Sequence, residues 1–436
     1  MNYIIVTSSG PFYHEKLVDK LIVSESVGGV ATAFRSLLEK NGGQWICWGK
    51  GSADGKFLNE EVHNYTIKRI ILTKNEKKGY YDNYSNGALW PLFHYFRENI
   101  KFIPNAFKIY SEVNKKYADR IFETLNKESI IWLNDYQMTM VPYYLREKGV
   151  ENQIIFTWHI PWISPEFFYI LPEAKTIMES ISKSNIITFH TKIYQKNFID
   201  TYEFIFKQKL KSKTYAIPLG IDTEYFSYKR GKKINSTNIV NKKIIFSIDR
   251  LDYTKGLINR IIAIERLLKK HPEYSEKFVY IMNVTPSRVN VDQYIKMKRE
   301  VEMTIGKVNG EYGNMGWTPI IYMYRKIKNK TLISYYKTAD IALITPLIDG
   351  LNLVSKEFIS VTRRGVLILS KFAGSASELQ DALLVNPYDI DEIVEAIVKA
   401  FNMTDEERYS RLESLKKDVY IKNSSWWYKK IISKIK

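Results

Sequence analysis

Short apolar runs rich in β-branched residues alternate with stretches of helical periodicity along both halves of the chain. Buried strands of a parallel sheet have this composition, and the helices between successive strands cover the faces of the sheet. The runs lie near residues 3–6, 130–133, 154–157, 186–189 and 215–220 in the first half, and near 243–248, 277–283, 319–323, 341–344, 366–369 and 383–385 in the second. The alternation predicts an α/β fold with one parallel sheet in each half.

The length of 436 residues exceeds what one hydrophobic core usually supports and favours two domains. Residues 223–242 are polar and without periodicity, as expected of a connection between domains. We expect a Rossmann-like domain over residues 1–225, a second over 240–420, and a C-terminal helix over 421–436 that packs back on the first. Two such domains are expected to face each other, with the active site in the cleft between them.

The composition limits which cellular compartment and which class of ligand are expected. Hydrophobic residues make up 45% of the chain, Cys47 is its single cysteine, and the formal net charge is +18. One cysteine excludes an intrachain disulfide framework and favours a reducing compartment, so we expect a cytoplasmic protein. We expect no signal peptide and no membrane span, since no apolar run reaches about 18 residues. The lysines are spread along the chain without a nucleic-acid motif, so the charge favours anionic small molecules over nucleic acid or a membrane.

The loop after the run at 243–248 carries two cations. Arg250, Lys255 and Gly256 precede a helix predicted from Leu257. Loops at the carboxyl ends of strands bind ligands in open α/β sheets, and two cations beside a helix N-terminus suit a nucleotide diphosphate. On this loop alone, two solvated surface charges are the slightly better interpretation.

A second loop of this kind follows the run at 341–344. Asp349 and Gly350 predict a turn, and a helix is predicted from Leu353, so the N–H groups of Leu353 and Val354 point out of its first turn toward an anion. The carboxylate of Glu357 suits a ribose diol, and that of Asp349 suits sugar hydroxyls. Taken singly, an Asp-Gly pair is usually only a turn.

A glycine pair lies near the first strand. We expect a polar loop after residues 3–6 that ends at Ser26, then Gly28-Gly29, then a helix over Val30 to Lys40. Glycines at the start of a helix let a phosphate approach the backbone closely, although turns use the same pair.

Long motifs from both halves occur in the order found in trehalose-6-phosphate synthases and closely resemble them. The second half has Arg250-Leu-Asp-Tyr-Thr-Lys-Gly-Leu257, Gly316-Trp-Thr-Pro319, Thr345-Pro-Leu-Ile-Asp-Gly-Leu-Asn-Leu-Val354 with Lys356-Glu357, and Phe372-Ala-Gly-Ser-Ala-Ser-Glu378 followed by Val385-Asn-Pro-Tyr-Asp389. The first half has Tyr81-Asp-Asn-Tyr-Ser-Asn-Gly-Ala-Leu-Trp-Pro91, Asn134-Asp-Tyr136, His159-Ile-Pro161 and Ser164-Pro-Glu166. The resemblance implies a retaining glycosyltransferase of the GT-B type that moves glucose from a nucleotide sugar, UDP-glucose first, to a sugar phosphate. It also implies that no metal or other cofactor is required, and that the protein forms a homo-oligomer.

The resemblance assigns roles to individual residues. For the donor it implies Arg250, Lys255, Gly28 and Gly29 on the diphosphate, Asn352, Leu353, Val354 and Glu357 on the nucleotide, and His159 and Asp349 on the glucose. For the acceptor it implies Tyr81, Trp90, Asp135 and Arg288, with Trp48 nearby. Arg250, Lys255, His159 and Asp349 are the residues expected to be catalytic. Without the resemblance, His159 is a packed structural histidine and Trp48, Tyr81 and Trp90 are core aromatics.

The first half departs from the family pattern. After the first strand the family has Ser-Asn-Arg, whose arginine grips the acceptor phosphate, whereas this chain has Thr7-Ser-Ser-Gly10. Asn134-Asp-Tyr-Gln137 replaces His-Asp-Tyr-His, and Trp162 stands where Phe is common. A charge-assisted contact contributes roughly 1.5–3 kcal/mol. Either another cation such as Lys16 or Lys50 compensates, or the acceptor differs.

Five functions therefore compete. The first is transfer from UDP-glucose to glucose 6-phosphate, and the second is the same donor chemistry with another phosphorylated acceptor such as glycerol 3-phosphate. A cyclitol-coupling relative is disfavoured because Asp349, Arg250 and Lys255 are all present. The complete donor set also argues against a non-catalytic regulator that binds nucleotide sugars, and a nucleic-acid-binding protein is the least favoured.

Overall fold

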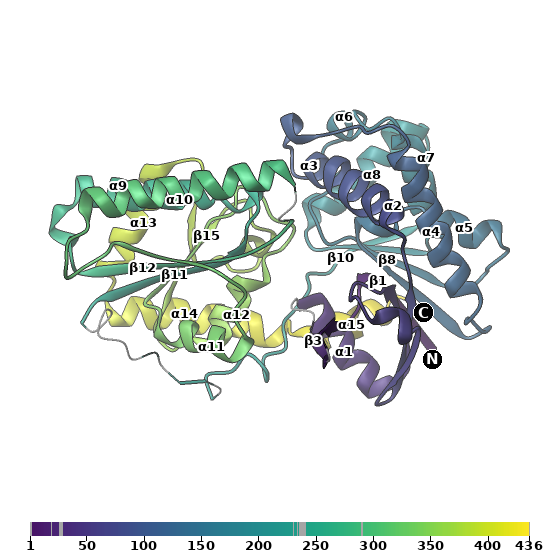
Figure 1. Cartoon of the computed structure of the whole chain (residues 1–436), viewed down its shortest axis with the longest axis horizontal. Helices are drawn as coiled ribbons and strands as arrows, with labels where there is room; N and C mark the ends of the chain where they lie inside the picture. Colours follow the sequence, from purple (N-terminus) through teal and green to yellow (C-terminus); the bar gives the residue numbers. More distant parts are fainter. Residues whose placement is uncertain are drawn as a thin grey trace. The chain divides into compact units, whose positions relative to one another are not determined.

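The chain folds into two α/β units, each built on its own sheet (Figure 1). The computed structural model describes residues 2–18, 20–25, 29–229, 231–232, 234, 241–288 and 291–435. One unit consists of Met1–Gly220 and Ser424–Lys436, and the other of Ile221–Asn423. Within the described ranges, no helix is long and apolar enough to cross a membrane. The predicted fold class of two Rossmann-like units is confirmed.

The sheet of the C-terminal unit contains a strand at each predicted run. Its strands are β11 (Lys243–Arg250), β12 (Phe278–Thr285), β13 (Ile320–Tyr324), β14 (Ile341–Ile344), β15 (Val366–Ser370) and β16 (Leu383–Val385). They pair in parallel in the order β13-β12-β11-β14-β15-β16. This is the 3-2-1-4-5-6 order of a Rossmann sheet, which binds ligands where the strand order reverses. In this unit the reversal lies between β11 and β14.

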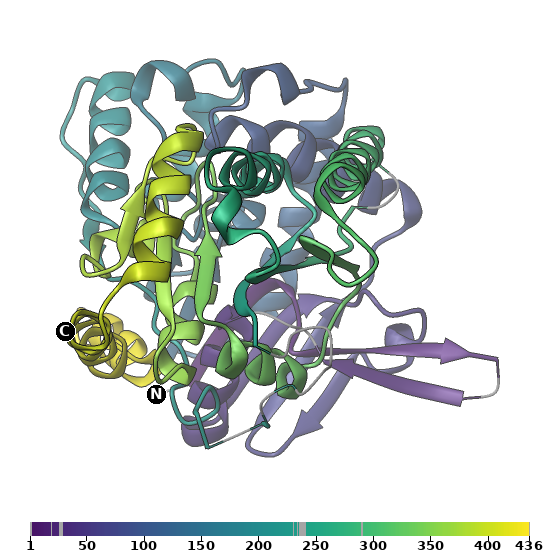
Figure 2. The ribbon, with the colours of Figure 1, turned by 90° about the vertical axis from the view of Figure 1, so that its left-hand side faces the viewer.

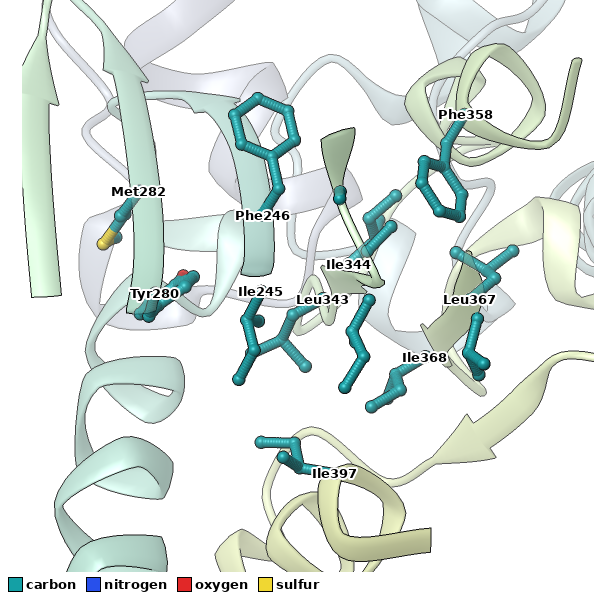
Figure 3. Close-up of a cluster of buried hydrophobic side chains, with 14 of the residues drawn as sticks. Ile245, Phe246, Tyr280, Met282, Leu343, Ile344, Phe358, Leu367, Ile368 and Ile397 are labelled. Carbon is teal, nitrogen blue, oxygen red and sulfur yellow. The ribbon is translucent and has the colours of Figure 1, made fainter. Parts of the chain in front are cut away.

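Helices cover both faces of this sheet. They are α9 (Leu257–Lys270), α10 (Asp292–Tyr312), α11 (Asn329–Thr338), α12 (Leu353–Val361), α13 (Ile390–Asn402) and α14 (Asp405–Ile421). Figure 1 shows α9, α10 and α13 on one face and α11, α12 and α14 on the other. Figure 3 shows side chains of four strands meeting Phe358 of α12 and Ile397 of α13 in the core.

The N-terminal unit has the same arrangement with more strands. Its sheet contains β1 (Asn2–Ser9), β4 (Gly43–Trp48), β5 (Asn59–Val62), β6 (Tyr65–Ile70), β7 (Ser129–Asn134), β8 (Ile154–Thr157), β9 (Ile186–Phe189) and β10 (Lys213–Ala216). The order is β10-β9-β8-β7-β1-β4-β6-β5, and only the edge strand β5 is antiparallel to its neighbour. The order reverses between β1 and β7, so the loops after these two strands lie at the ligand-binding position of the sheet.

The helices of the N-terminal unit include its last element in sequence. They are α1 (Gly29–Asn41), α2 (Lys74–Lys77), α3 (Trp90–Phe93), α4 (Ala106–Phe122), α5 (Val141–Glu147), α6 (Pro165–Phe168), α7 (Ala174–Ser182), α8 (Lys192–Phe206) and α15 (Ser424–Ile432). Trp427 of α15 is fully buried, with ring centroids 5.4 Å from Phe34 of α1 and 5.3 Å from Trp132 of β7. Because aromatic residues bury the largest apolar areas, this contact ties α15 to the N-terminal unit.

The expected polar loop after the first strand was wrong in part. It contains an antiparallel hairpin of β2 (Phe12–Leu17) and β3 (Lys20–Glu25) (Figure 2). His14 of β2 is buried, and its backbone N–H donates to the carboxylate of Asp54 at 2.8 Å. The hairpin is thus held at its base by a polar contact, which a search for apolar runs does not detect.

A π-helical segment, η2 (Lys78–Leu89), leads into α3. π-helical turns are rare and often mark functional sites. This segment carries Tyr81, and Trp90 follows it directly. Two predicted acceptor ligands therefore lie on an unusual backbone.

The C-terminal unit buries a carboxylic acid on α12. Glu357 is 8% exposed, and the Tyr336 hydroxyl donates to it at 3.0 Å. Burial raises the pKa of Glu357 to about 7, while the Tyr336 hydrogen bond works in the opposite direction. The Glu357 carboxyl is therefore protonated below neutral pH, and the folded protein loses stability when this group ionises.

The substitution Glu357→Gln should remove a pH-dependent loss of stability. The unfolded carboxyl releases its proton near pH 4.5, whereas the folded one keeps it up to about 7. The free energy of unfolding therefore falls by up to about 3 kcal/mol as pH rises through this window. Urea unfolding at several pH values should show the variant gaining stability relative to the wild type as pH increases. The exposed Glu395→Gln is the matched control, and parallel profiles for wild type and Glu357→Gln would contradict the assignment.

Candidate active-site residues

The loop after β11 is fixed at the reversal point of the C-terminal sheet. Gly256 has a φ of +63°, and a Cβ there would lie 2.4 Å from the Thr345 carbonyl oxygen, so only glycine fits. The Leu347 N–H donates to the Thr254 carbonyl at 2.8 Å. These contacts join the loop after β11 to the loop after β14.

The structure brings three of the predicted donor residues together. The Lys255 ammonium lies 2.6 Å from the Asp349 carboxylate, and the Asn352 side-chain amide donates to the same carboxylate oxygen at 3.1 Å. Lys255 is 7% exposed. A cation and a carboxylate held in this way are oriented before any ligand arrives.

The first turn of α12 continues this group. Asn352, with a φ of +73°, caps the helix by accepting the Ser355 N–H at 3.1 Å. The cap leaves the N–H groups of Leu353 and Val354 pointing out of the helix start, as the sequence predicted. Glu357 lies one turn further along on the same helix, where Tyr336 contacts it.

Arg260 was not identified from the sequence. It lies on the buried face of α9, fully buried, and its guanidinium donates to Asp249 at 2.6 Å and to the Leu343 carbonyl at 3.3 Å. It also donates to the Lys255 carbonyl. An arginine among the apolar positions of a helix was the available signal. It holds the loop that carries Lys255.

The two predicted arginines occupy different surroundings. Arg250 is exposed at the end of β11. Arg288, predicted as an acceptor ligand, belongs to the C-terminal unit, where its guanidinium donates to Asp252 at 2.9 Å and contacts the Tyr294 hydroxyl. Burial disfavours ionisation of Asp252, but the nearby cations, Arg288 first, outweigh it and lower the pKa of this carboxyl.

In the N-terminal unit the predicted residues His159 and Asp135 are in contact. The backbone N–H of His159 donates to the Asp135 carboxylate at 3.2 Å. In the His159 ring, Nε2 lies 2.9 Å from the Asn134 side-chain oxygen and Nδ1 lies 3.1 Å from His190 Nε2. His190 accepts the Leu219 N–H at Nδ1. Its Nε2–H therefore donates to His159 Nδ1, and His159 Nε2–H donates to Asn134.

This hydrogen-bond chain requires a neutral His159. Desolvation lowers the pKa of His159 to about 3, so the ring carries no charge at neutral pH. His190 was not identified from the sequence. It follows the buried strand β9 directly, and this position at a strand end could have indicated it.

The predicted aromatic residues contact other rings at both ends of η2, with Tyr81 in its first turn and Trp90 directly after it. The rings of Trp48 and Tyr81 lie 5.6 Å apart, and that of Trp90 lies 5.9 Å from Tyr136. Gly29 begins α1, whereas Gly28 lies outside the described residues. Within the described part of the chain, no group of three or more His, Cys, Asp or Glu side chains could hold a metal ion.

The chain matches a known protein family over its length. The model of Glycosyltransferase family 20 matches residues 2–436. A bifunctional trehalose-6-phosphate synthase/phosphatase of Thermoproteus tenax is 35% identical over 93% of this chain. The match spans 60% of that relative's length.

Two solved structures are similar throughout. The Escherichia coli structure described as trehalose-6-phosphate bound with UDP-2-fluoro glucose has a TM-score of 0.92 at 31% identity, and covers 100% of this chain and 98% of that one. A UDP-forming alpha,alpha-trehalose-phosphate synthase of Burkholderia xenovorans, in complex with glucose-6-phosphate, has a TM-score of 0.91 at 28% identity and covers 100% and 99%. The order of the motifs, the two Rossmann-like units and the match over residues 2–436 agree, and this chain belongs to glycosyltransferase family 20.

Proposed function

We propose that the protein is a retaining glucosyltransferase that transfers glucose from UDP-glucose to glucose 6-phosphate, releasing UDP and forming trehalose 6-phosphate. The observation that carries this proposal is the Lys255–Asp349 pair at the reversal point of the C-terminal sheet in a member of family 20. The E. coli relative binds a UDP-glucose analogue and the Burkholderia relative binds glucose 6-phosphate, which supports the same substrates here.

The donor is assigned chiefly to the C-terminal unit. We assign the diphosphate to Arg250, Lys255 and the N–H groups of Leu353 and Val354, the ribose to Glu357, and the glucose to Asp349 and His159. Asn352 positions Asp349 through its side-chain amide, and Gly28 and Gly29 approach the diphosphate. The acceptor is assigned to Tyr81, Trp90, Asp135 and Arg288. The roles follow from charge and placement, since cations and helix N–H groups favour phosphate oxygens.

The reaction breaks the bond between the anomeric carbon and the phosphate oxygen. Negative charge then grows on the departing UDP, and preorganised cations stabilise it where it develops. The acceptor hydroxyl attacks from the same face, and its proton passes to the leaving phosphate oxygen. No protein base is needed for this step, which agrees with a neutral His159 whose pKa is about 3.

A second candidate acceptor is glycerol 3-phosphate. It is favoured by one observation, the absence of the family's arginine in Thr7-Ser-Ser-Gly10. With this acceptor the donor chemistry is unchanged and the product is a glucosylglycerol phosphate.

We further propose that the reaction needs no metal, takes place in the cytoplasm and is carried out by a homo-oligomer. Cations of the chain at the leaving group support the first point, and the single buried cysteine supports the second. The third rests on family membership alone, and light scattering of the purified protein tests it.

Purified protein should release UDP from UDP-glucose much faster with a phosphorylated acceptor than with free glucose or with no acceptor. Glucose 6-phosphate should be the best acceptor, with trehalose 6-phosphate identified by mass spectrometry and NMR. Glycerol 3-phosphate, free glucose, ADP-glucose and GDP-glucose are tested in parallel. Product from glycerol 3-phosphate but not from glucose 6-phosphate would replace the first acceptor with the second. Absence of nucleotide release with every pair would reject the transfer activity.

The substitution Lys255→Ala should lower kcat by roughly a hundredfold to a thousandfold, because it removes a cation from the leaving group. Calorimetry with UDP should show weakened binding, and a thermal melt should show a folded protein. Lys269→Ala, in the exposed last turn of α9, is the matched control and should behave as wild type. Near-normal turnover of a folded Lys255→Ala protein would contradict the assigned role.

A further inference from the structure

The turn after β4 reads Trp48-Gly-Lys-Gly51, and a side chain at either glycine would meet neighbouring atoms. A Cβ on Gly49 would lie 2.8 Å from the Ile71 side chain and 2.9 Å from that of Asp54. A Cβ on Gly51 would lie 2.0 Å from the His14 carbonyl oxygen. The turn therefore packs against Ile71 and Asp54 on one side of Lys50 and against the β2–β3 hairpin on the other.

Buried polar groups fix this turn. The Asp54 carboxylate accepts the His14 and Gly51 N–H groups, both at 2.8 Å, and the Ala53 N–H donates to the His14 carbonyl at 3.0 Å. Arg69, buried beside Asp54, donates to Glu60 at 2.7 Å. Because buried charges are costly to separate from their partners, these contacts hold the backbone that follows Lys50.

The Lys50 ammonium is held at the carboxyl ends of β1 and β4. It donates to the Ser9 hydroxyl, and it lies 5.4 Å from the ring centroid of Trp48 and 5.3 Å from that of Tyr81. The ammonium of Lys77 lies 6.0 Å from the Trp48 ring. In the described part of the chain, no ion pair joins either ammonium to a carboxylate.

Two ammonium groups without a carboxylate partner suit a dianion. An ammonium has three N–H donors, of which the Ser9 hydroxyl takes one for Lys50, and lysine is a common phosphate ligand. The faces of the Trp48 and Tyr81 rings orient the Lys50 ammonium, but a ring face does not bind an anion. A phosphate monoester bound by these two ammonium groups would also meet the Ser9 hydroxyl, and its sugar ring would have the rings of Trp48 and Tyr81 beside it.

The other candidate cations are held differently. Arg288, which is also assigned to the acceptor, has its guanidinium buried against the carboxylate of Asp252. Lys16 lies on the exposed part of β2, and its backbone N–H donates to the Ser52 hydroxyl at 3.0 Å. Among the described residues, no hydrogen bond or ring contact holds its ammonium at the strand ends.

We propose that Lys50 binds the acceptor phosphate, with Lys77 and the Ser9 hydroxyl as further ligands. This inference rests on the proposed function for the identity of the acceptor. It makes Lys50 the residue that distinguishes a phosphorylated acceptor from the free sugar, whichever phosphorylated acceptor is used. The chain then binds the phosphate from the end of β4 and not through an arginine at the end of β1.

The test compares acceptor kinetics of Lys50→Ala, Lys50→Arg and Lys56→Ala at saturating UDP-glucose. Losing one charge-assisted contact typically weakens binding by roughly tenfold to a hundredfold. The KM for glucose 6-phosphate in Lys50→Ala should rise by this factor with a smaller change in kcat, while transfer to free glucose is unchanged. Lys50→Arg should recover most of the affinity. Lys56→Ala changes an exposed lysine of η1 (Asp54–Lys56), the short helix that follows this turn, and should match the wild type.

Calorimetry separates this inference from the proposed function. Glucose 6-phosphate, glycerol 3-phosphate and UDP are titrated into wild-type protein and the variants, with thermal melts to verify folding. UDP affinity should be unchanged in Lys50→Ala, and affinity for the sugar phosphate should fall. An unchanged KM and affinity for the phosphorylated acceptors, or equal losses for glucose and glucose 6-phosphate, would overturn the role of Lys50. If wild type binds a sugar phosphate but transfers nothing, the proposed function fails while the titrations still decide the role of Lys50.

Discussion

The Lys255–Asp349 ion pair is the contact on which the candidate donor site depends. It joins the loops after β11 and β14, the two strands between which the order of the C-terminal sheet reverses. Removing two charges from water is costly, and the cost is offset here by a 2.6 Å contact and by the Asn352 amide on the same carboxylate. Arg260 constrains the same loop further, because its guanidinium donates to the Lys255 carbonyl. The cation therefore needs little reorganisation when charge develops on a leaving group.

The N-terminal unit shows the opposite electrostatic design around His159. His190, His159 and Asn134 form a chain of neutral hydrogen bonds, and the low pKa of His159, about 3, keeps this ring uncharged. A neutral ring with both nitrogens engaged orients other groups and does not exchange protons with a substrate at neutral pH. In the proposed assignment, the cations lie at the two expected phosphate sites, namely the loop after β11 in the C-terminal unit and the turn at Lys50. The proposed sugar contacts come from neutral His159, from aromatic rings and from the carboxylates of Asp349 and Asp135.

Much of this arrangement was predictable because the C-terminal strands are continuous apolar runs, each followed by a helical repeat. Arg250, Lys255 and Asp349 could be placed at strand ends for the same reason, without knowledge of any contact. The strands β4 to β6 escaped prediction, since β5 is a polar edge strand of sequence Asn-Glu-Glu-Val that the periodicity of buried strands does not describe. Pairings across long separations also escaped it. Tyr336 with Glu357 and Arg288 with Asp252 are set by packing, and no local pattern encodes them.

The β2–β3 hairpin, which was expected to be a loop, supports the candidate acceptor site without contributing a ligand to it. Its residue His14 supplies an N–H and a carbonyl to the turn that carries Lys50, and stacks on Phe57 at 4.0 Å. Without those contacts the carboxylate of Asp54 would be buried with fewer donors, and such a loss costs roughly 1–3 kcal/mol per unsatisfied group. The turn would then relax toward solvent and release Lys50 from the Trp48 and Tyr81 rings. A short polar segment that contributes no ligand can therefore determine whether Lys50, the cation proposed to bind phosphate, is preorganised.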